Sequence, residues 1–156
     1  MATVKERRAQ ESEREEEYFL GEIYKNTKMG ADAIINLLPH VKDDTVRSLL
    51  TMQLDGYEKY AARAAKQLRE RDVTPKEEGF LTRVGARFGI TLQTMFDSTT
   101  SHIAELVVEG SNMGITEMTK LLNTYVPLGE AQEAVQLARE VVAFEEHNLE
   151  LMKRFL

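Results

Sequence analysis

The sequence contains no cysteine and no tryptophan, and its 156 residues include only three histidines and three prolines. Without cysteine the chain cannot form a disulfide, supply a thiolate nucleophile, or bind zinc or an iron–sulfur cluster through sulfur. Any metal would have to be held by carboxylates and at most a few histidines. These absences exclude whole classes of redox and metal chemistry before any motif is considered.

Long hydrophobic runs are also lacking. The longest, residues 33–38, is interrupted by Asn36 and falls far short of the roughly 20 residues that span a bilayer. The N-terminus is charged and lacks the apolar segment of a secretory signal. We therefore expect a cytoplasmic protein with no membrane partner.

The charge balance is acidic, with a formal net charge of −6. Basic residues cluster only briefly, in Lys5-Glu6-Arg7-Arg8, so no nucleic-acid partner is expected. The length fits a single domain over residues 1–156 with a substantial core. Residues 1–11 form a charged N-terminal extension within it, and the mixed charge of residues 5–17 is typical of either a solvated helical extension or a frayed tail.

Apolar residues recur at three- and four-residue steps in four long segments, which predicts four helices. The predicted helices cover residues 12–38, 43–72, 98–125 and 128–155. The prolines fall between these segments, where they interrupt no helix; they are Pro39, Pro75 and Pro127. No period-two pattern predicts a strand.

The connection between the second and third long helices is the longest. Thr74-Pro75-Lys76-Glu77 is typical of a capping box with proline at the first helical position. We therefore predict that residues 75–96 form a crossover that contains a shorter helix. The resulting order is helix, short loop, helix, long crossover, helix, short loop, helix, which is the order of two hairpins lying side by side.

The third long helix has two unusual features. Gly110 and Gly114 each cost about 1 kcal/mol relative to alanine in a helix, so either another helix packs closely there, such as the crossover helix, or the helix breaks between them. The apolar arc of residues 103–125 is wide, which predicts contact with more than one element. This arc is the reason to expect a homodimer.

Helices of this length around the Pro75 crossover, together with the Glu109-Gly110 pair, resemble the ferritin-like superfamily. Within it the chain is most similar to small bacterial ferritin-like proteins of unknown function, over residues 12–156. The resemblance implies an all-α, ferritin-like four-helix bundle. It also implies a di-iron or di-manganese site built from one Glu on each of two helices and a Glu-x-x-His pair on each of the other two.

The ligand pattern of that family is mostly missing. No Glu-x-x-His occurs in the sequence. Glu145 lies in the apolar stripe of the last helix, but Asn148 follows three residues later and His147 falls on the outward face. If iron or manganese is bound, the resemblance and the helix faces point to a small set of ligands: Glu145, Glu22, Glu109 and Tyr57.

The inward polar positions instead form a mostly neutral layer, predicted to contain Asn26, Thr27, Gln53, Tyr57, Glu145 and Asn148. Glu145 is therefore either a surviving metal ligand or a buried acid hydrogen-bonded to Tyr57 or Gln53. On the third helix, His102, Glu105 and Glu109 share one face, which fits either an intersubunit metal site or a solvated ion pair. Asp97, Ser101 and His102 are too close along one helix to form a catalytic triad, so no catalytic residue is predicted.

The function predicted from sequence is a non-catalytic structural or binding protein with a degenerate metal site, acting as a homodimer with an unknown protein partner. The alternative is a carboxylate-bridged di-iron or di-manganese protein with oxidase, peroxidase or iron-handling activity. A third possibility is an adaptor whose charged N-terminal helix recruits its partner.

Overall fold

The computed structural model describes residues 1–76, 98–125 and 132–156. Within these ranges all regular structure is helical, as the sequence predicts. The four long helices are α1 (Val4–Leu37), α2 (Asp44–Glu70), α4 (Thr100–Tyr125) and α5 (Gln132–Lys153), and a short 3₁₀ turn, η1 (Leu38–His40), follows α1. The predicted crossover helix and the loop at Pro127 lie outside the described residues.

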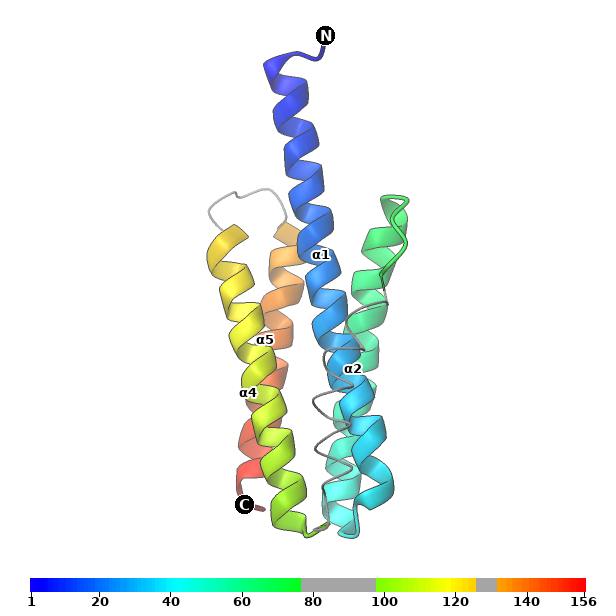
Figure 1. The fold of residues 1–156 in the computed structure, drawn as a ribbon, viewed down its shortest axis with the longest axis vertical. Helices are drawn as coiled ribbons and strands as arrows, with labels where there is room; N and C mark the ends of the chain where they lie inside the picture. The colour runs from blue at the N-terminus through cyan, green and yellow to red at the C-terminus, as the bar shows by residue number, and fades with distance from the viewer. Residues whose placement is uncertain (77–97, 126–131) are drawn as a thin grey trace.

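The helices form a bundle of two antiparallel hairpins (Figure 1). One hairpin is α1 with α2, and the other is α4 with α5. Between the hairpins, α1 packs mainly on α4 and α2 packs on α5. Among the described residues, no helix combines the length and apolar character needed to cross a membrane.

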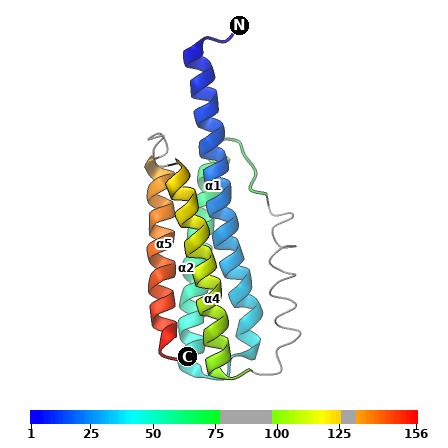
Figure 2. The same cartoon turned by 60° about the vertical axis from the view of Figure 1, so that its left-hand side comes forward.

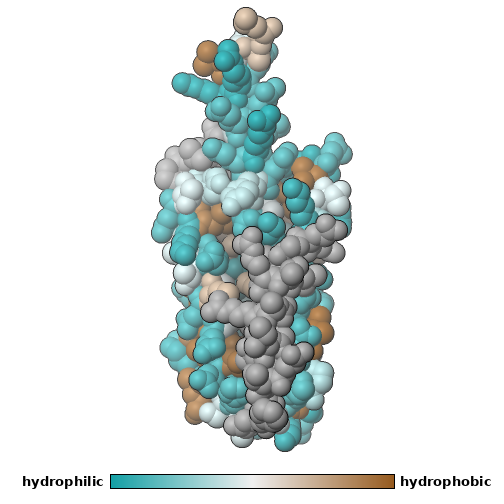
Figure 3. All heavy atoms as spheres, viewed as in Figure 1, coloured by the Kyte–Doolittle hydropathy of each residue, from teal (hydrophilic) through white to brown (hydrophobic). Residues whose placement is uncertain are grey.

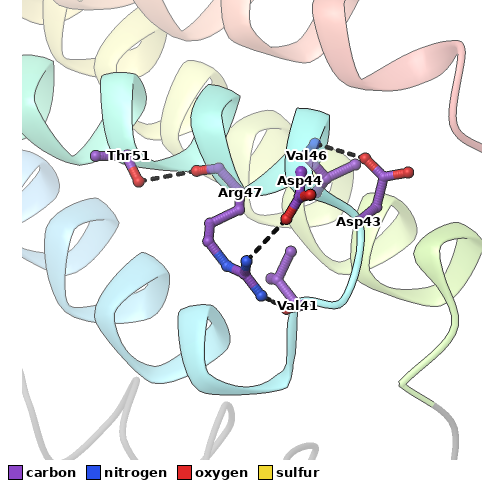
Figure 4. A network of polar contacts seen from close by, with 6 residues as sticks. All are labelled: Val41, Asp43, Asp44, Val46, Arg47 and Thr51. Carbon is purple, nitrogen blue, oxygen red and sulfur yellow. Dashed lines mark hydrogen bonds and ion pairs between the residues drawn. The ribbon is translucent and has the colours of Figure 1, made fainter.

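The start of α2 is fixed by a polar network (Figure 4). Asp43 is the N-cap, and its Oδ1 accepts a hydrogen bond from the Val46 amide at 2.9 Å. The Arg47 guanidinium reaches Asp44 at 3.0 Å and the Val41 carbonyl oxygen at 2.5 Å. These contacts satisfy backbone groups at the helix end, so they close the short loop between α1 and α2 where the sequence predicts a cap.

The first helix begins earlier than the sequence suggests. It starts at Val4, not near Ser12, because Thr3 and Glu6 form a capping box. The Glu6 amide donates to Thr3 Oγ1 at 3.2 Å, and the Thr3 amide donates to Glu6 at 2.6 Å. Of the two predicted states of residues 5–17, the structure has the helical extension. It projects beyond the other helices in both views (Figures 1 and 2).

The buried apolar side chains form two clusters along the bundle axis. The Phe19 cluster lies toward the end from which α1 projects and includes Phe19, Leu20, Ile23, Leu68, Met118, Leu137 and Val141. The Ile34 cluster lies toward the opposite end and includes Ile34, Leu37, Val46, Leu50, Ile103, Val107 and Met152. Near the C-terminus, Leu137 is fully buried in the first of these clusters, whereas Leu156 is 59% exposed.

The third long helix, α4, is continuous through Gly110 and Gly114, so the predicted alternative of a break there is wrong. Its wide apolar arc does contact more than one element, since α4 packs on both α1 and α5. Ile103, Met118 and Leu121 of this arc are buried within the single chain. The arc is therefore accounted for without a second copy of the protein.

Candidate functional site: a polar layer inside the bundle

A layer of buried polar side chains separates the two apolar clusters. On α1, α4 and α5 these residues fall along the chain between members of the two clusters, whereas on α2 the polar residue falls between two members of the Ile34 cluster. The buried polar side chains of the described residues are Asn26 and Thr27 on α1, Gln53 on α2, Ser111 on α4, and Glu145 and Asn148 on α5. Burying a polar group costs free energy unless it finds a hydrogen-bond partner, whereas an apolar side chain in the same place needs none. This layer is therefore the candidate functional site.

Its centre is a hydrogen bond between Tyr57 and Glu145. The Tyr57 hydroxyl donates to Glu145 Oε1 at 3.1 Å, and the two residues come from facing helices, α2 and α5. Glu145 is only 2% exposed and Tyr57 only 4%. Of the alternatives that the sequence leaves open for Glu145, the buried acid bonded to Tyr57 is present in this geometry.

Two glycines provide the space for this pair. A Cβ atom added at Gly114 on α4 would lie 2.2 Å from Glu145 Oε1, and one added at Gly30 on α1 would lie 2.4 Å from the Tyr57 ring. A larger residue at either glycine would force the Glu145 carboxyl group or the Tyr57 ring to shift. The close packing predicted at Gly114 is therefore present, but its neighbour is the side chain of Glu145.

Burial raises the pKa of both partners. Removal from water raises the pKa of Glu145 to about 8, although the hydrogen bond from Tyr57 acts in the opposite direction. Burial, and then the proximity of Glu145, raise the pKa of Tyr57 well above its usual value. Because a charged carboxylate is costly in such a site, Glu145 is mostly protonated at pH 7.

Further contacts tie the layer to α1 and α4. Asn26 Nδ2 donates to the Gly114 carbonyl oxygen at 3.2 Å, so α1 and α4 are joined beside Glu145. The Thr27 hydroxyl bonds within its own helix, to the carbonyl oxygens of Ile23 and Tyr24. The described hydrogen bonds of the buried Thr27 hydroxyl therefore stay within α1 and do not join it to another helix.

Several polar atoms of the layer have no hydrogen-bond partner among the described residues. They are Asn26 Oδ1, Gln53 Nε2, Glu145 Oε2 and Asn148 Nδ2. A cavity of about 30 Å³ is lined by three of these side chains together with Tyr57 and Ser111. The rest of the lining is mostly apolar, but a cavity of this size with several polar groups in its wall is large enough for one or two water molecules.

The other predicted metal ligands lie away from this centre. Glu22 is partly exposed and pairs with Lys25 at 3.2 Å, and Glu109 is exposed. The geometry thus brings together Glu145 and Tyr57 of the proposed set, but not Glu22 or Glu109. Asn148 is buried one turn after Glu145, and His147 is exposed, as predicted.

The face with His102 contains an ion pair and no larger cluster. His102 Nδ1 lies 3.5 Å from Glu105, and Glu105 and Glu109 are exposed. Asp97, the remaining residue of the triad considered from sequence, lies outside the described residues. Across residues 1–76, 98–125 and 132–156, no group of three or more acidic or histidine side chains is placed to hold a metal ion.

Ser111 is the member of the layer that the sequence analysis missed. It is 4% exposed and lines the cavity with Glu145. Its position midway between Val107 and Gly114 places it inside the apolar arc of α4. The sequence signal that could have identified it is a polar residue at an inward position of the wide apolar arc.

The polar layer does not fit a dinuclear metal centre of the kind that the resemblance implies. Two divalent ions need several carboxylates to balance their charge and supply oxygen ligands, whereas this layer has one carboxyl group among neutral amides and hydroxyls. The arrangement is instead suited to hydrogen bonding and to holding one proton on Glu145. Comparisons of the chain with protein-family models, curated proteins and solved structures give no match.

Proposed function

We propose that this chain is a ferritin-like helical bundle with a structural or binding role rather than a catalytic one. In this proposal a neutral hydrogen-bonded layer takes the place of the metal centre. The observation that supports it best is the Tyr57–Glu145 contact, in which the single buried carboxyl group is bonded to a phenol at 3.1 Å. Its raised pKa further favours a neutral, proton-bearing layer at pH 7.

The layer would hold the two hairpins in one register. It joins α2 to α5 through Tyr57 and Glu145 and joins α1 to α4 through Asn26 and the Gly114 carbonyl. Apolar packing alone tolerates sliding and repacking, whereas buried polar contacts have demanding geometry. Cytoplasmic location and homodimer formation remain part of this proposal.

The alternative is an iron or manganese protein that uses Glu145 and Tyr57. One observation favours it, since Glu145 Oε2 has no partner among the described residues and Glu145 lines the cavity. The scarcity of further carboxylates in the layer disfavours it.

Elemental analysis separates the two functions. The protein is purified without chelator, reloaded with Fe(II) or Mn(II), dialysed and analysed beside Glu145→Ala. We expect less than one tenth of an equivalent of metal in both proteins. A stoichiometric metal that Glu145→Ala removes would overturn the proposal in favour of the alternative.

A further inference from the structure

The projecting part of α1 has an unusual distribution of charge. Residues 1–10 contain three basic residues and one acidic residue, whereas residues 11–17 contain five glutamates and one arginine. The first buried residue of α1 is Phe19, so none of the side chains before it is buried in the bundle. The projecting segment is mostly hydrophilic at the top of Figure 3.

One face of this segment carries both charge signs and an apolar residue at each end. Val4, Arg8, Glu11, Glu15 and Tyr18 follow one another at steps of four and three residues, which places them on the same side of the helix. Val4 is 65% exposed and Tyr18 is 55% exposed. None of the three charged residues between them forms an ion pair with another described residue.

A helix of this kind lacks internal support. A stretch of about 12–15 residues is only marginally helical in water unless its side chains pack on something. The capping box at Thr3 helps to start the helix, but the Val4–Tyr18 face is exposed along most of its length. Within the chain it is contacted at its Tyr18 end, where the ring of Tyr125 lies 5.9 Å away between centroids. The same face in a second copy is complementary to it when the two helices run in opposite directions.

We propose that two copies of this chain associate through the Val4–Tyr18 face of α1, with the extensions antiparallel. In this arrangement Arg7 and Arg8 of each copy lie against Glu15 of the other. Val4 of each copy covers Tyr18 of the other, and Glu11 faces its own counterpart. This surface differs from the arc of α4, which is buried within one chain, and it gives the homodimer of the proposed function a specific interface.

A charge-swap experiment by analytical ultracentrifugation tests this interface. Arg7→Glu with Arg8→Glu makes the face acidic, and Glu11→Lys with Glu15→Lys makes it basic. Each double variant alone is expected to lose self-association by at least tenfold in Kd, because its copies repel each other. An equimolar mixture of the two variants is expected to recover association, since the two faces are again complementary.

A matched control reverses charges elsewhere on the exposed surface. Asp55 and Lys59 form an exposed ion pair on α2, so Asp55→Lys with Lys59→Glu retains the pair and leaves the Val4–Tyr18 face intact. This control should associate like the wild type. Raising NaCl from 50 to 500 mM should weaken wild-type association roughly tenfold, because exposed ion pairs are screened by salt.

Glu11 tests the register of the antiparallel overlap. An antiparallel overlap that sets Val4 against Tyr18 also sets Glu11 against its own counterpart, so Glu11→Gln should tighten the dimer roughly two- to fivefold by removing a like-charge contact. Weaker association of Glu11→Gln would contradict this register.

The remaining outcomes separate this interface from the wider proposal. A dimer that persists in both double variants at 50 mM NaCl, where their like charges repel most strongly, would overturn the α1 interface and leave a homodimer through another surface. A wild-type chain that stays monomeric at hundreds of micromolar would overturn both the interface and the homodimer. A mixture that fails to associate, although circular dichroism shows both variants folded, would also overturn the interface.

Discussion

The Phe19 cluster and the polar layer are built by the same four helices, but they are stabilised in different ways. In the Phe19 cluster, contact is between apolar side chains such as Phe19 and Leu137, both fully buried. In the polar layer, a few directed contacts among Tyr57, Glu145, Asn26 and the Gly114 backbone join the helices. The stability of the Phe19 cluster should depend mainly on the volume of its side chains. The stability of the polar layer should depend on protonation and on individual hydrogen-bonding atoms.

This difference indicates where function should be sought. Apolar burial stabilises the bundle in proportion to area, and it is sufficient to hold four helices together. Burying Glu145 between the apolar clusters works against that stabilisation at neutral pH. A layer that lowers stability in this way is a candidate for a role beyond folding, such as fixing the register of the hairpins.

The largest predicted effect lies in the Phe19 cluster. Phe19→Ala should lower the free energy of unfolding by about 3–5 kcal/mol, because it removes a large, fully buried ring and leaves a cavity. Phe19 also loses its edge contact with Tyr125, whose ring centroid lies 5.5 Å away. Urea denaturation at pH 5.5 and pH 8.5 should give the same loss at both values. A loss that depended on pH would show that the two regions are not independent.

Glu145→Gln should raise the free energy of unfolding, in contrast to Phe19→Ala, and the gain should depend on pH. The folded-state pKa of about 8 lies above the ordinary value near 4.3, so the folded wild type holds its proton more tightly than the unfolded chain. The wild type therefore loses stability as pH rises from about 4.5 to about 8. Glutamine retains an oxygen for the Tyr57 hydroxyl and does not ionise. The variant should thus be more stable on the order of 3 kcal/mol at pH 8 and nearly equal to wild type at pH 4.5.

Denaturation curves from pH 4.5 to 8.5 would check this prediction. Glu146→Gln is the matched control, since Glu146 is the exposed neighbour on the same helix and should leave the pH profile unchanged. If Glu145→Gln were less stable than wild type at pH 8, Glu145 would have to be stabilised as a carboxylate, as a bound cation would do.

Gly114→Ala tests the space around Glu145. Its Cβ would lie 2.2 Å from Glu145 Oε1, so the carboxyl group must move and strain its bond to Tyr57. We expect a loss of about 1–2 kcal/mol, after a gain of about 1 kcal/mol from helix propensity has offset part of the overpacking.

Gly21→Ala is the control for helix propensity. No atom lies within 4 Å of a Cβ added at Gly21, so this variant should be stabilised by up to about 1 kcal/mol. Thermal unfolding of both variants compares them directly. Equal gains would mean that Gly114 is not required for space.

The helices were predictable because their signals are local. Apolar periodicity and the cap at Asp43 place α2 within two residues of its predicted ends, since both depend on residues close in sequence. The start of α1 was left open between a helical extension and a frayed tail, because a charged, exposed helix has no apolar stripe. There the capping box of Thr3 and Glu6 was the only local signal.

The polar layer was predictable in membership but not in contacts. Helix phase identified Asn26, Gln53, Tyr57, Glu145 and Asn148 as inward, and all five are buried. Phase does not give the height of one helix against another, so it could not show that Gly114 lies beside Glu145 or that Asn26 bonds to its carbonyl group. For the same reason, Glu22 and Glu109 were included in the predicted metal-ligand set, although neither is buried.

The smallest effect is expected from Tyr57→Phe. This change removes the donor to Glu145 Oε1 and retains the ring that contacts Phe144, whose centroid lies 5.0 Å away. It should cost about 1 kcal/mol, the usual net value of one hydrogen bond. The lost bond also stabilised the ionised form, so the pKa of Glu145 should rise further and the decline in stability should continue to higher pH. Urea denaturation of Tyr57→Phe, Glu145→Gln and the double variant measures the coupling between the two residues. Additive effects in that cycle would mean that the 3.1 Å contact contributes nothing, and the layer would then be held together by burial of its neighbours alone.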